Sequence, residues 1–589
     1  MRIKHFFGLA VLAAMTASCS SNNELVNGGN GSGENESGAS YASITIDLPT
    51  TSGTRAANDD FNEGTASEYA VNDATLLIFE KDGSSENEYK FVEQASLGNL
   101  EPWKKDNDAN GITTEATITA QLNKATVGNN NYYALVILNN KDKDDADKVT
   151  LPSGTTTYGE WNVAAHATET KLVDNTKGFY MANAPEFKAA DQEPTTLVPI
   201  TGIYRTKEEA HSKPGTTVHV ERGLAKVTVG KGTGKDYFTG AKASGSKYSN
   251  DDVTITNWAL DVTNKSSFPV HVTAGLKDGV TSTSQTVPAY TDIWKNAAAT
   301  PGTKPATSRF VSQLPATGAF KRVYWGIDPN YSKSLTDKDA CGQEFTLVKA
   351  DGSDADWKTS TEPLYCLENT FDITHMLQGQ TTRVLLKATY TPNAVASEED
   401  KTFFMIGNSS DIWTKTKLIA QITSKAKEAL GMTTDPTVEL KEDLLKGGTH
   451  FLTTENVSIK DGETEKVNTP GLVDKLNNKL GLDKTNGVGI KTYKNGESYY
   501  IARIKHFGDD LTPWAAGDET YGGKNLNWLG RYGVLRNNWY DLTIEKISGP
   551  GYPDVPEVKP DTPDDEDTKY INVSVKILDW AKRSQNVDL

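Results

Sequence analysis

The sequence predicts an all-β protein that folds as a β-sandwich and not from alternating strands and helices. Short segments rich in β-branched and aromatic residues recur along the 589 residues, separated by clusters of Gly, Asn, Asp and Pro. Strands with such punctuation favour packed antiparallel sheets. Helical periodicity is scarce, and we find it mainly in 416–430 and 471–480, each followed by a glycine. We expect these two segments to be short helices inserted in the second half of the chain.

The first predicted strand covers residues 41–48. Its apolar residues occupy every second position and polar residues fill the positions between, which is the pattern of a half-buried strand. The apolar positions are Ala42, Ile44, Ile46 and Leu48. Further strands are predicted at 74–79, 132–138, 218–229, 253–262, 322–327, 383–390 and 499–504.

The charge balance argues against one class of partner. The chain has 61 Lys and Arg against 78 Asp and Glu, a formal net charge of −17. A net acidic protein repels phosphate backbones, so we do not expect nucleic acid as a partner.

The first nineteen residues have the pattern of a lipoprotein signal peptide. Arg2 and Lys4 precede an apolar run, 6–17, that is too short to span a membrane as a helix. The sequence Thr-Ala-Ser-Cys at 16–19 then fits a lipobox, in which the Cys19 thiol accepts the lipid. An ordinary signal peptide with a chance cysteine is the alternative. A tether rich in Gly, Ser and Asn follows.

A loop without apolar pattern follows the first predicted strand, and Arg55 is its only basic residue. An exposed arginine in a flexible loop is a target for an Arg-specific protease, and a surface arginine without consequence is the alternative.

The C-terminal end combines a stiff segment with a strand. Residues 549–567 contain five prolines and seven acidic residues, which predicts an extended spacer. A strand pattern follows, and its apolar face must be buried in its own domain or in another subunit. The apolar residues of this last segment are Ile571, Val573, Val575, Ile577, Trp580, Val587 and Leu589.

These end segments suggest a way to polymerise. Cleavage at Arg55 would remove the first strand and open a groove, which the terminal strand of a neighbouring copy could fill by strand addition. Because this contact is head-to-tail, its repetition gives an open filament.

Several motifs make the chain similar to the type V fimbrillins, and most similar to the branch of short-fimbria major (shaft) subunits. Each motif is weak alone, but their order is fairly specific and spans the chain from Cys19 to Leu589. Besides the lipobox and the terminal strand, they are TRA at 54–56, VERGLAKV at 220–227, WALDVTN at 258–264, YWGIDPNY at 324–331, YCLENTF at 365–371 and RNNWY at 536–540.

The resemblance implies two transthyretin-like β-sandwich domains in tandem and a structural role in a surface fimbria that supports adhesion. It implies a palmitate-bearing precursor in the outer membrane, cut between Arg55 and Ala56 and polymerised through a C-terminal donor strand. The partners would be other copies, tip, accessory and anchor subunits, and the protease. The implied segments are a signal peptide at 1–19, a tether and removable strand at 20–55, sandwich domains at 56–230 and 231–548, a spacer at 549–568 and the donor strand at 569–589.

Motifs for other chemistry are weak. The sequence lacks H-E-x-x-H and G-x-S-x-G, and the loop 230–235 departs from a phosphate-binding loop. The acidic turn 106–111 resembles the start of a calcium loop but lacks its final glutamate. We therefore expect no catalytic, cofactor or metal site. Cys341 and Cys366 could pair or remain buried thiols.

Three other functions stay open at this point. The chain could be a monomeric surface lipoprotein that binds glycans or host protein, a fimbrial anchor or accessory subunit, or an enzyme with paired carboxylates in a cleft.

Overall fold

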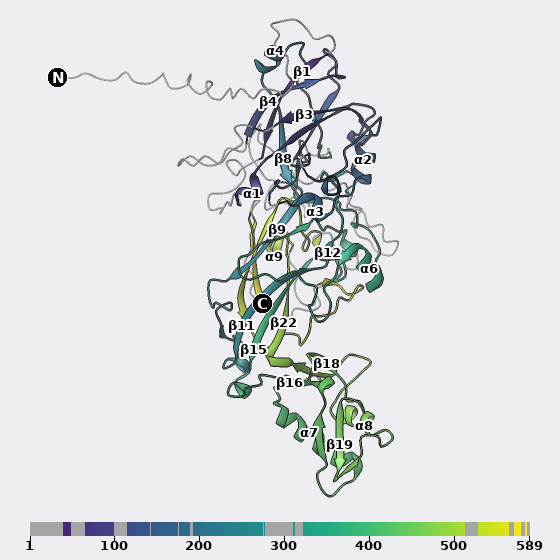
Figure 1. Cartoon of the computed structure of the whole chain (residues 1–589), viewed down its shortest axis with the longest axis vertical. Coiled ribbons are helices and arrows are strands. Elements are labelled where there is room, and N and C mark those ends of the chain that lie inside the picture. The colour runs from purple at the N-terminus through teal and green to yellow at the C-terminus, as the bar shows by residue number, and fades with distance from the viewer. Residues whose placement is uncertain are drawn as a thin grey trace, which may run out of the picture.

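The computed structural model describes residues 39–48, 65–98, 100, 115–141, 143–174, 176–188, 193–274, 276, 310–311, 322–512, 528–564, 571–578 and 583–585, the last two segments by their backbone alone. The molecule is elongated, with a first sheet at one end, two facing sheets in the middle and a small lobe at the other end (Figure 1). Most regular structure is strand, in several sheets, and the helices are few and short. The predicted all-β class is confirmed.

The first sheet contains the N-terminal strands in the order β3-β2-β5-β6-β8-β1-β4, with β7 also paired to β5. Its edges approach each other, because the Glu93 carboxylate on β3 accepts the backbone N–H groups of Asn123, Lys124 and Ala125, just after β4. The curled sheet therefore encloses one core. The strands are β1 (Ser40–Asp47), β2 (Ala74–Glu80), β3 (Lys90–Gly98), β4 (Glu115–Leu122), β5 (Tyr132–Leu138), β6 (Met181–Asn183), β7 (Val198–Pro199) and β8 (Thr216–Arg222).

The other face of this sheet is covered by helices. Phe79 on β2 packs edge-to-face on Tyr158 at the start of α2, where a capping box between Thr157 and Glu160 begins the helix. The helices of this half are α1 (Ala66–Tyr69), α2 (Tyr158–Ala164), α3 (Glu169–Leu172) and α4 (Lys207–His211).

Two sheets form a sandwich in the middle of the molecule. One has the order β10-β11-β15-β22 and the other β14-β9-β23-β24-β25. Apolar residues of both sheets share one core, including Val229, Leu386 and Leu542. The strands are β9 (Leu224–Lys231), β10 (Ala241–Lys242), β11 (Asp252–Asp261), β14 (Leu364–Leu367), β15 (Arg383–Thr391), β22 (Glu497–Arg503), β23 (Trp539–Ile547), β24 (Ile571–Leu578) and β25 (Arg583–Gln585).

Shorter elements flank this sandwich. They are the strand pair β12 (Thr263–Asn264) and β13 (Phe345–Thr346), and the helices α6 (Lys338–Glu344) and α9 (Gly508–Leu511). The described single turns of 3-10 helix are η1 (Glu86–Glu88), η2 (Asp145–Asp147), η3 (Ser246–Tyr248), η5 (Ile373–His375), η6 (Asn393–Val395), η7 (Glu442–Leu445) and η8 (Lys494–Gly496).

Two strand predictions are wrong in detail. The predicted strand 218–229 is two strands, and the chain passes at Gly223 from the first sheet to the sheet of the sandwich that contains β9. A Cβ at Gly223 would lie 3.2 Å from the Tyr180 ring, so the crossing is tightly packed. The segment 322–327 forms only isolated bridges, because its buried Tyr324 and Trp325 pack in a core of irregular loops.

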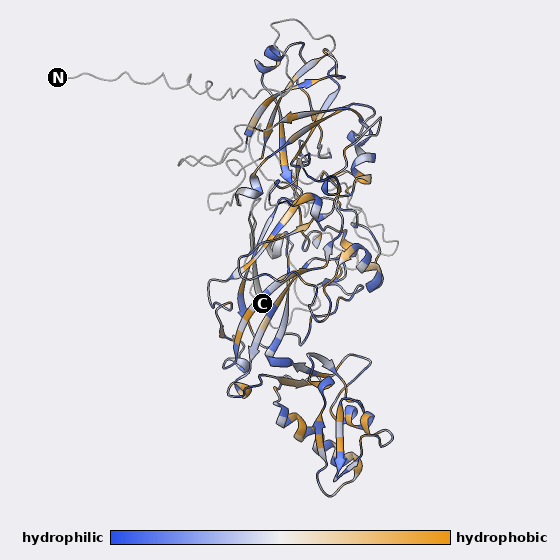
Figure 2. Ribbon diagram, viewed as in Figure 1, coloured by the Kyte–Doolittle hydropathy of each residue, from blue (hydrophilic) through white to orange (hydrophobic). Residues whose placement is uncertain are grey.

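The lobe is an insertion between β15 and β22. Both helices predicted from periodicity are confirmed there, as α7 (Lys415–Leu430) and α8 (Leu472–Lys479), and their apolar faces contribute to a separate core. Figure 2 shows hydrophobic and hydrophilic residues mixed within these helices. The lobe's strands are β16 (Phe403–Ile406), β17 (Thr437–Leu440), β18 (Gly448–His450), β19 (Val457–Asp461), β20 (Thr464–Glu465) and β21 (Ile490–Tyr493).

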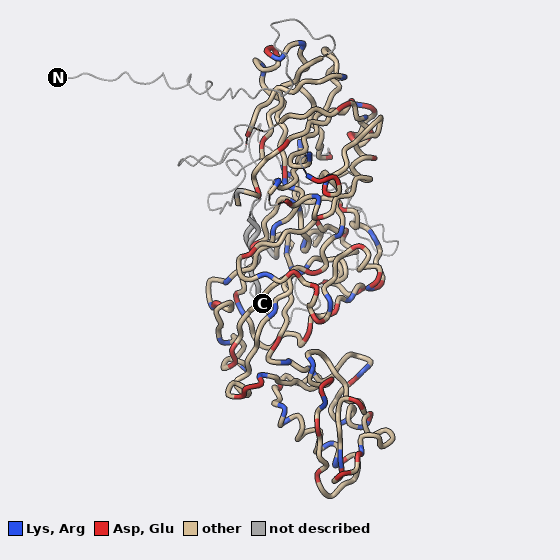
Figure 3. The backbone as a smooth tube through the Cα atoms, viewed as in Figure 1, with Lys and Arg blue, Asp and Glu red and all other residues tan. Residues whose placement is uncertain are grey.

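Both signs of charge are spread along the whole length of the described chain (Figure 3). None of the described helices is long and apolar enough to cross a membrane.

Candidate functional site

The strand that precedes the predicted cleavage site lies inside the first sheet and has a hydrogen-bonded neighbour on each side. β1 pairs antiparallel with β4 over its full length, from Ser40 opposite Leu122 to Asp47 opposite Glu115, and it pairs parallel with β8 from Ile44 to Asp47. Its apolar side chains are almost completely buried: Ala42, Ile44 and Ile46 are 0 % exposed and Leu48 is 4 % exposed. Removal of this strand would therefore leave an apolar groove between two unpaired strand edges.

The other face of β1 carries hydroxyl groups that face hydroxyl groups of β4. The Thr45 and Thr117 hydroxyls are 2.8 Å apart and share a hydrogen bond. Ser43 lies opposite Thr119, and both of these hydroxyls are buried without a hydrogen-bond partner among the described residues. A buried hydroxyl without a hydrogen-bond partner is destabilising. β1 therefore leaves the hydroxyl of Thr119 in the groove without a hydrogen bond.

The last residue of β1 faces a like charge. Asp47 lies opposite Glu115 on β4, and burial together with that carboxylate raises the pKa of Asp47 to about 6. His219 on β8 is also adjacent, with 3.8 Å between its Nε2 and Asp47 Oδ2, but burial lowers the pKa of His219 to about 4. Near neutral pH the histidine is therefore uncharged, and the two carboxylates repel each other.

The predicted terminal strand is observed as β24, and in this structure it pairs with its own chain. It runs antiparallel to β23, from Leu578 opposite Trp539 to Ile571 opposite Ile547, and the short β25 pairs on its other side. This register sets Lys576 opposite Asp541.

The described segment before β24 lies against the sandwich and does not project from it as a spacer. Val555 and Val558 are buried. Its last described residue, Asp564, forms an ion pair with Arg503 on β22, with 2.5 Å between Oδ1 and Nε, and both side chains are at most 2 % exposed. Arg383 on β15 donates to the Pro556 carbonyl at 2.6 Å. We call residues 549–564 the belt.

A buried ion pair joins α1, just after the predicted cleavage loop, to the sandwich. The Glu68 carboxylate lies 2.7 Å from the Lys226 ammonium on β9 and accepts a hydrogen bond from the Tyr365 hydroxyl. The side chain of Glu68 is 0 % exposed and that of Lys226 is 5 % exposed. The Arg222 Nε donates to the Glu68 carbonyl at 2.7 Å. Lys226 also lies 3.9 Å above the ring of Trp539, the first residue of β23.

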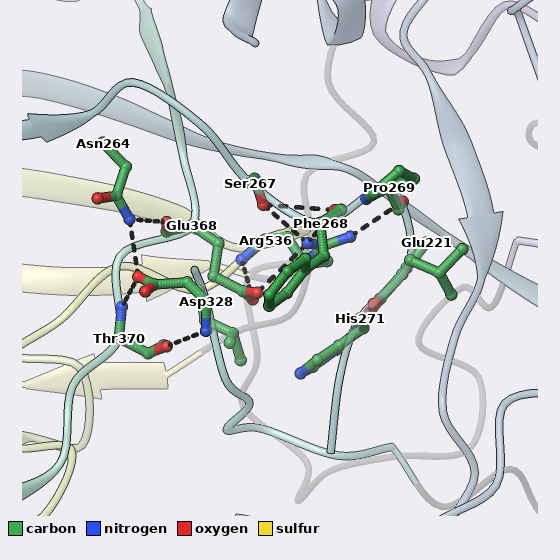
Figure 4. A network of polar contacts seen from close by, with 12 residues as sticks. Glu221, Asn264, Ser267, Phe268, Pro269, His271, Asp328, Glu368, Thr370 and Arg536 are labelled. Atoms are coloured by element: carbon green, nitrogen blue, oxygen red, sulfur yellow. Dashed lines mark hydrogen bonds and ion pairs between the residues drawn. The ribbon is translucent and has the colours of Figure 1, made fainter. Parts of the chain in front are cut away.

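A second polar network ties loops of the second half together (Figure 4). Arg536 is buried; it pairs with Glu368 at 3.3 Å and donates to the Phe268 carbonyl at 2.8 Å. Burial raises the pKa of the nearby Asp328 to about 7, although that carboxylate accepts the Thr370 N–H. The network binds backbone groups of packed loops, among them the Phe268 carbonyl and the Thr370 N–H.

Residues 491–586 match the family model described as "Major fimbrial subunit protein type IV, Fimbrillin, C-terminal". This part of the chain is similar to a fimbrillin C-terminal region. The matched region includes β22, β23, the belt and β24, so the family pattern covers the terminal strand and the strand on which it lies.

Solved structures of low identity also resemble the chain. A candidate cell adhesion protein from Parabacteroides distasonis has 11% identity and a TM-score of 0.37, over 92% of this chain and 98% of that one. One from Bacteroides eggerthii has 12% identity and a TM-score of 0.30, over 94% and 98%. The tip fimbrial protein Mfa3 from Porphyromonas gingivalis, with a C-terminal truncation, has 10% identity and a TM-score of 0.26, over 92% and 100%. No curated protein sequence matches the chain.

Several predicted site residues lie outside the described part of the chain. They are Cys19, Arg55, Ala56, Trp580, Val587 and Leu589, together with the acidic turn 106–111. For Ile571, Val573, Val575 and Ile577 the backbone alone is described.

The remaining chemistry is sparse in the described residues. No three His, Cys, Asp or Glu side chains among them gather as a metal site. Cys341 and Cys366 are separate buried thiols, which decides between the two alternatives left open by the sequence.

Sequence reasoning missed β4 and with it Glu115 and Thr119. The segment 115–122 alternates apolar Ala116, Ile118 and Ala120 with polar residues, so its period of two was a usable signal.

Proposed function

We propose that this fimbrillin is a structural shaft subunit of a surface fimbria, of the short-fimbria type. It is exported as a precursor that carries palmitate on Cys19 in the outer membrane. An Arg-specific protease cuts it between Arg55 and Ala56, and the processed copies polymerise head-to-tail by donor-strand exchange into a filament that supports adhesion. Tip, accessory and anchor subunits are its further partners, and it has no enzymatic role.

The observation that carries this proposal is the position of β1. A strand that lies between two others and buries an apolar face is normally retained in a protein. β1 lies between β4 and β8 in this way, yet it is followed by a loop whose only basic residue, Arg55, is the proposed cleavage site. Full burial of its three large apolar side chains contributes roughly 5–9 kcal/mol, an upper estimate against an extended unfolded chain. Any strand of matching pattern that binds in the groove left by its removal would contribute about the same burial free energy.

The contacts of α1 explain why cleavage would not unravel the first domain. The new N-terminus at Ala56 would lie only twelve residues before Glu68, which is fixed by its buried pair with Lys226. The chain after the cut thus stays joined to the sandwich.

The experiment is to determine, by mass spectrometry, the N-terminus of protein sheared from the cell surface. A start at Ala56 in material that forms detergent-resistant multimers is the expected result. A lipidated start at Cys19 in all surface protein would contradict processing and polymerisation.

One observation favours a second candidate function. β24 pairs with β23 of its own chain over eight residues, as a monomeric surface lipoprotein that binds glycans or host protein would require. Under that alternative, replacement of Val573 and Val575 by Asp unfolds the monomer. In a shaft subunit the same change removes multimers and leaves the precursor's first sheet folded.

A further inference from the structure

We infer that the terminal strand of a neighbouring copy occupies the β1 groove in one register, with Tyr570 at the position of Tyr41 and Lys576 at the position of Asp47. This inference rests on the proposed function and adds to it the residues that select the register. The two segments are YASITIDL at 41–48 and YINVSVKI at 570–577.

The apolar positions agree in this register and in no neighbouring one. Residues 571, 573, 575 and 577 replace the four buried apolar residues of β1, which lie at 42, 44, 46 and 48. A shift of two residues in one direction puts Lys569 at the buried Ala42 position, and the opposite shift puts Asp579 at the buried Leu48 position. A shift of one residue exchanges the faces entirely. Each of these alternatives buries a charged or polar side chain in an apolar core.

The positions on the hydroxyl face agree as well. Ser574 takes the place of Thr45 and keeps a hydroxyl opposite Thr117. Asn572 takes the place of Ser43, opposite the Thr119 hydroxyl that has no partner in the described structure. An amide both donates and accepts hydrogen bonds and reaches further than a serine hydroxyl, so the donor strand can satisfy a group that β1 leaves unsatisfied.

The main difference between the strands is the charge at one position. β1 places Asp47 opposite Glu115, a like-charge pair, whereas the donor strand in this register places Lys576 there. Opposite charges directly across an antiparallel pair stabilise it and like charges destabilise it. In its own chain Lys576 lies opposite Asp541. The terminal strand therefore meets an acidic residue in both positions, and the processed groove favours it over β1.

Pairs of introduced cysteines test the register directly. The full chain with Glu115→Cys and Lys576→Cys is processed by an Arg-specific protease, oxidised in air and analysed by gel electrophoresis under denaturing, non-reducing conditions. We expect a covalent ladder that reductant collapses, because directly opposed residues lie within disulfide reach. In the control, Thr119→Cys replaces Glu115→Cys and sets the cysteines about 13 Å further apart along β4, so no ladder forms. The unprocessed Asp47→Cys, Glu115→Cys chain should close its disulfide within one molecule.

A charge exchange tests the same contact without cysteines. In processed protein, Glu115→Lys should slow multimer formation by about threefold to tenfold, and Lys576→Glu in the same chain should restore it. Unchanged rates in the single variant, or a ladder from the Thr119→Cys chain in place of the Glu115→Cys chain, would overturn the register while wild-type multimers still support the proposed function. If processed wild-type protein forms no multimers, the proposed function itself fails.

Discussion

Replacing Asp47 by lysine should hold β1 more tightly in the precursor. The change removes a like-charge pair with Glu115 and creates an opposite-charge pair, and each effect is worth about 0.2–1 kcal/mol across an antiparallel pair. The sum of about 0.4–2 kcal/mol lowers the equilibrium constant for local opening of β1 by between about twofold and thirtyfold. Asp47→Asn removes only the repulsion and should lie between wild type and Asp47→Lys.

Hydrogen exchange of the backbone amides in 40–47, followed by mass spectrometry on the unprocessed chain, measures this opening. The pH dependence gives an independent check. The pKa of Asp47 is raised from 3.8 to about 6 in the folded chain, so its ionisation opposes folding, and β1 becomes more stable as the pH falls through 6. After correction for intrinsic exchange, wild type should approach Asp47→Asn at pH 5 and open more readily at pH 7.5.

Two results would refute this reasoning. One is equal protection of β1 in wild type and Asp47→Lys at pH 7.5. The other is a pH dependence in Asp47→Asn as large as in wild type, because the effect would then come from other groups. A control chain with Thr117→Ser keeps the cross-strand hydroxyl pair and should exchange like wild type.

Three further predictions concern the contacts that surround the exchanging strands. Lys226→Met leaves the buried Glu68 carboxylate without its cation and should cost about 3–5 kcal/mol in thermal unfolding, whereas the additional change Glu68→Leu should recover most of that loss. Arg503→Met removes the partner of Asp564 and should expose the belt to limited proteolysis, and a belt that stays as resistant as in wild type would contradict its anchoring there. The Cys366 thiol is buried and its pKa is raised well above the ordinary range, so alkylation at pH 8 should be slow until denaturant is added. Rapid alkylation of the native protein would contradict the burial of this thiol.

The strands whose faces differ in polarity could be predicted from the sequence. The period of two in 41–48 is strict, and the structure buries its apolar face as this pattern predicts. The half-buried state is wrong, because Ser43 and Thr45 on the polar face are buried as well. Helix α7 could also be predicted, because its apolar spacing ends at Gly431, which adopts the left-handed conformation of a helix C-cap.

The failures occur where the local sequence does not record the packing. Strand-forming residues stand on both sides of Gly223, with valine at 218, 220, 227 and 229, so strand composition continues through the crossing from one sheet to the other. Tyr324 and Trp325 have strong strand propensity, but their rings fill a core between loops, and tertiary packing overrides the propensity. Pairings between distant residues, such as Glu68 with Lys226, leave no local signal at all.

The lobe between β15 and β22 leaves and rejoins the sandwich at a single point. Phe403 and Tyr493 are paired across β16 and β21, and their rings stack with centroids 4.4 Å apart. An insertion that begins and ends side by side can change its length and surface without altering the register of the strands beneath it. The turn at Gly462 between β19 and β20, where an added Cβ would meet nothing within 4 Å, is accordingly a place to graft a foreign epitope that every copy of the subunit would display.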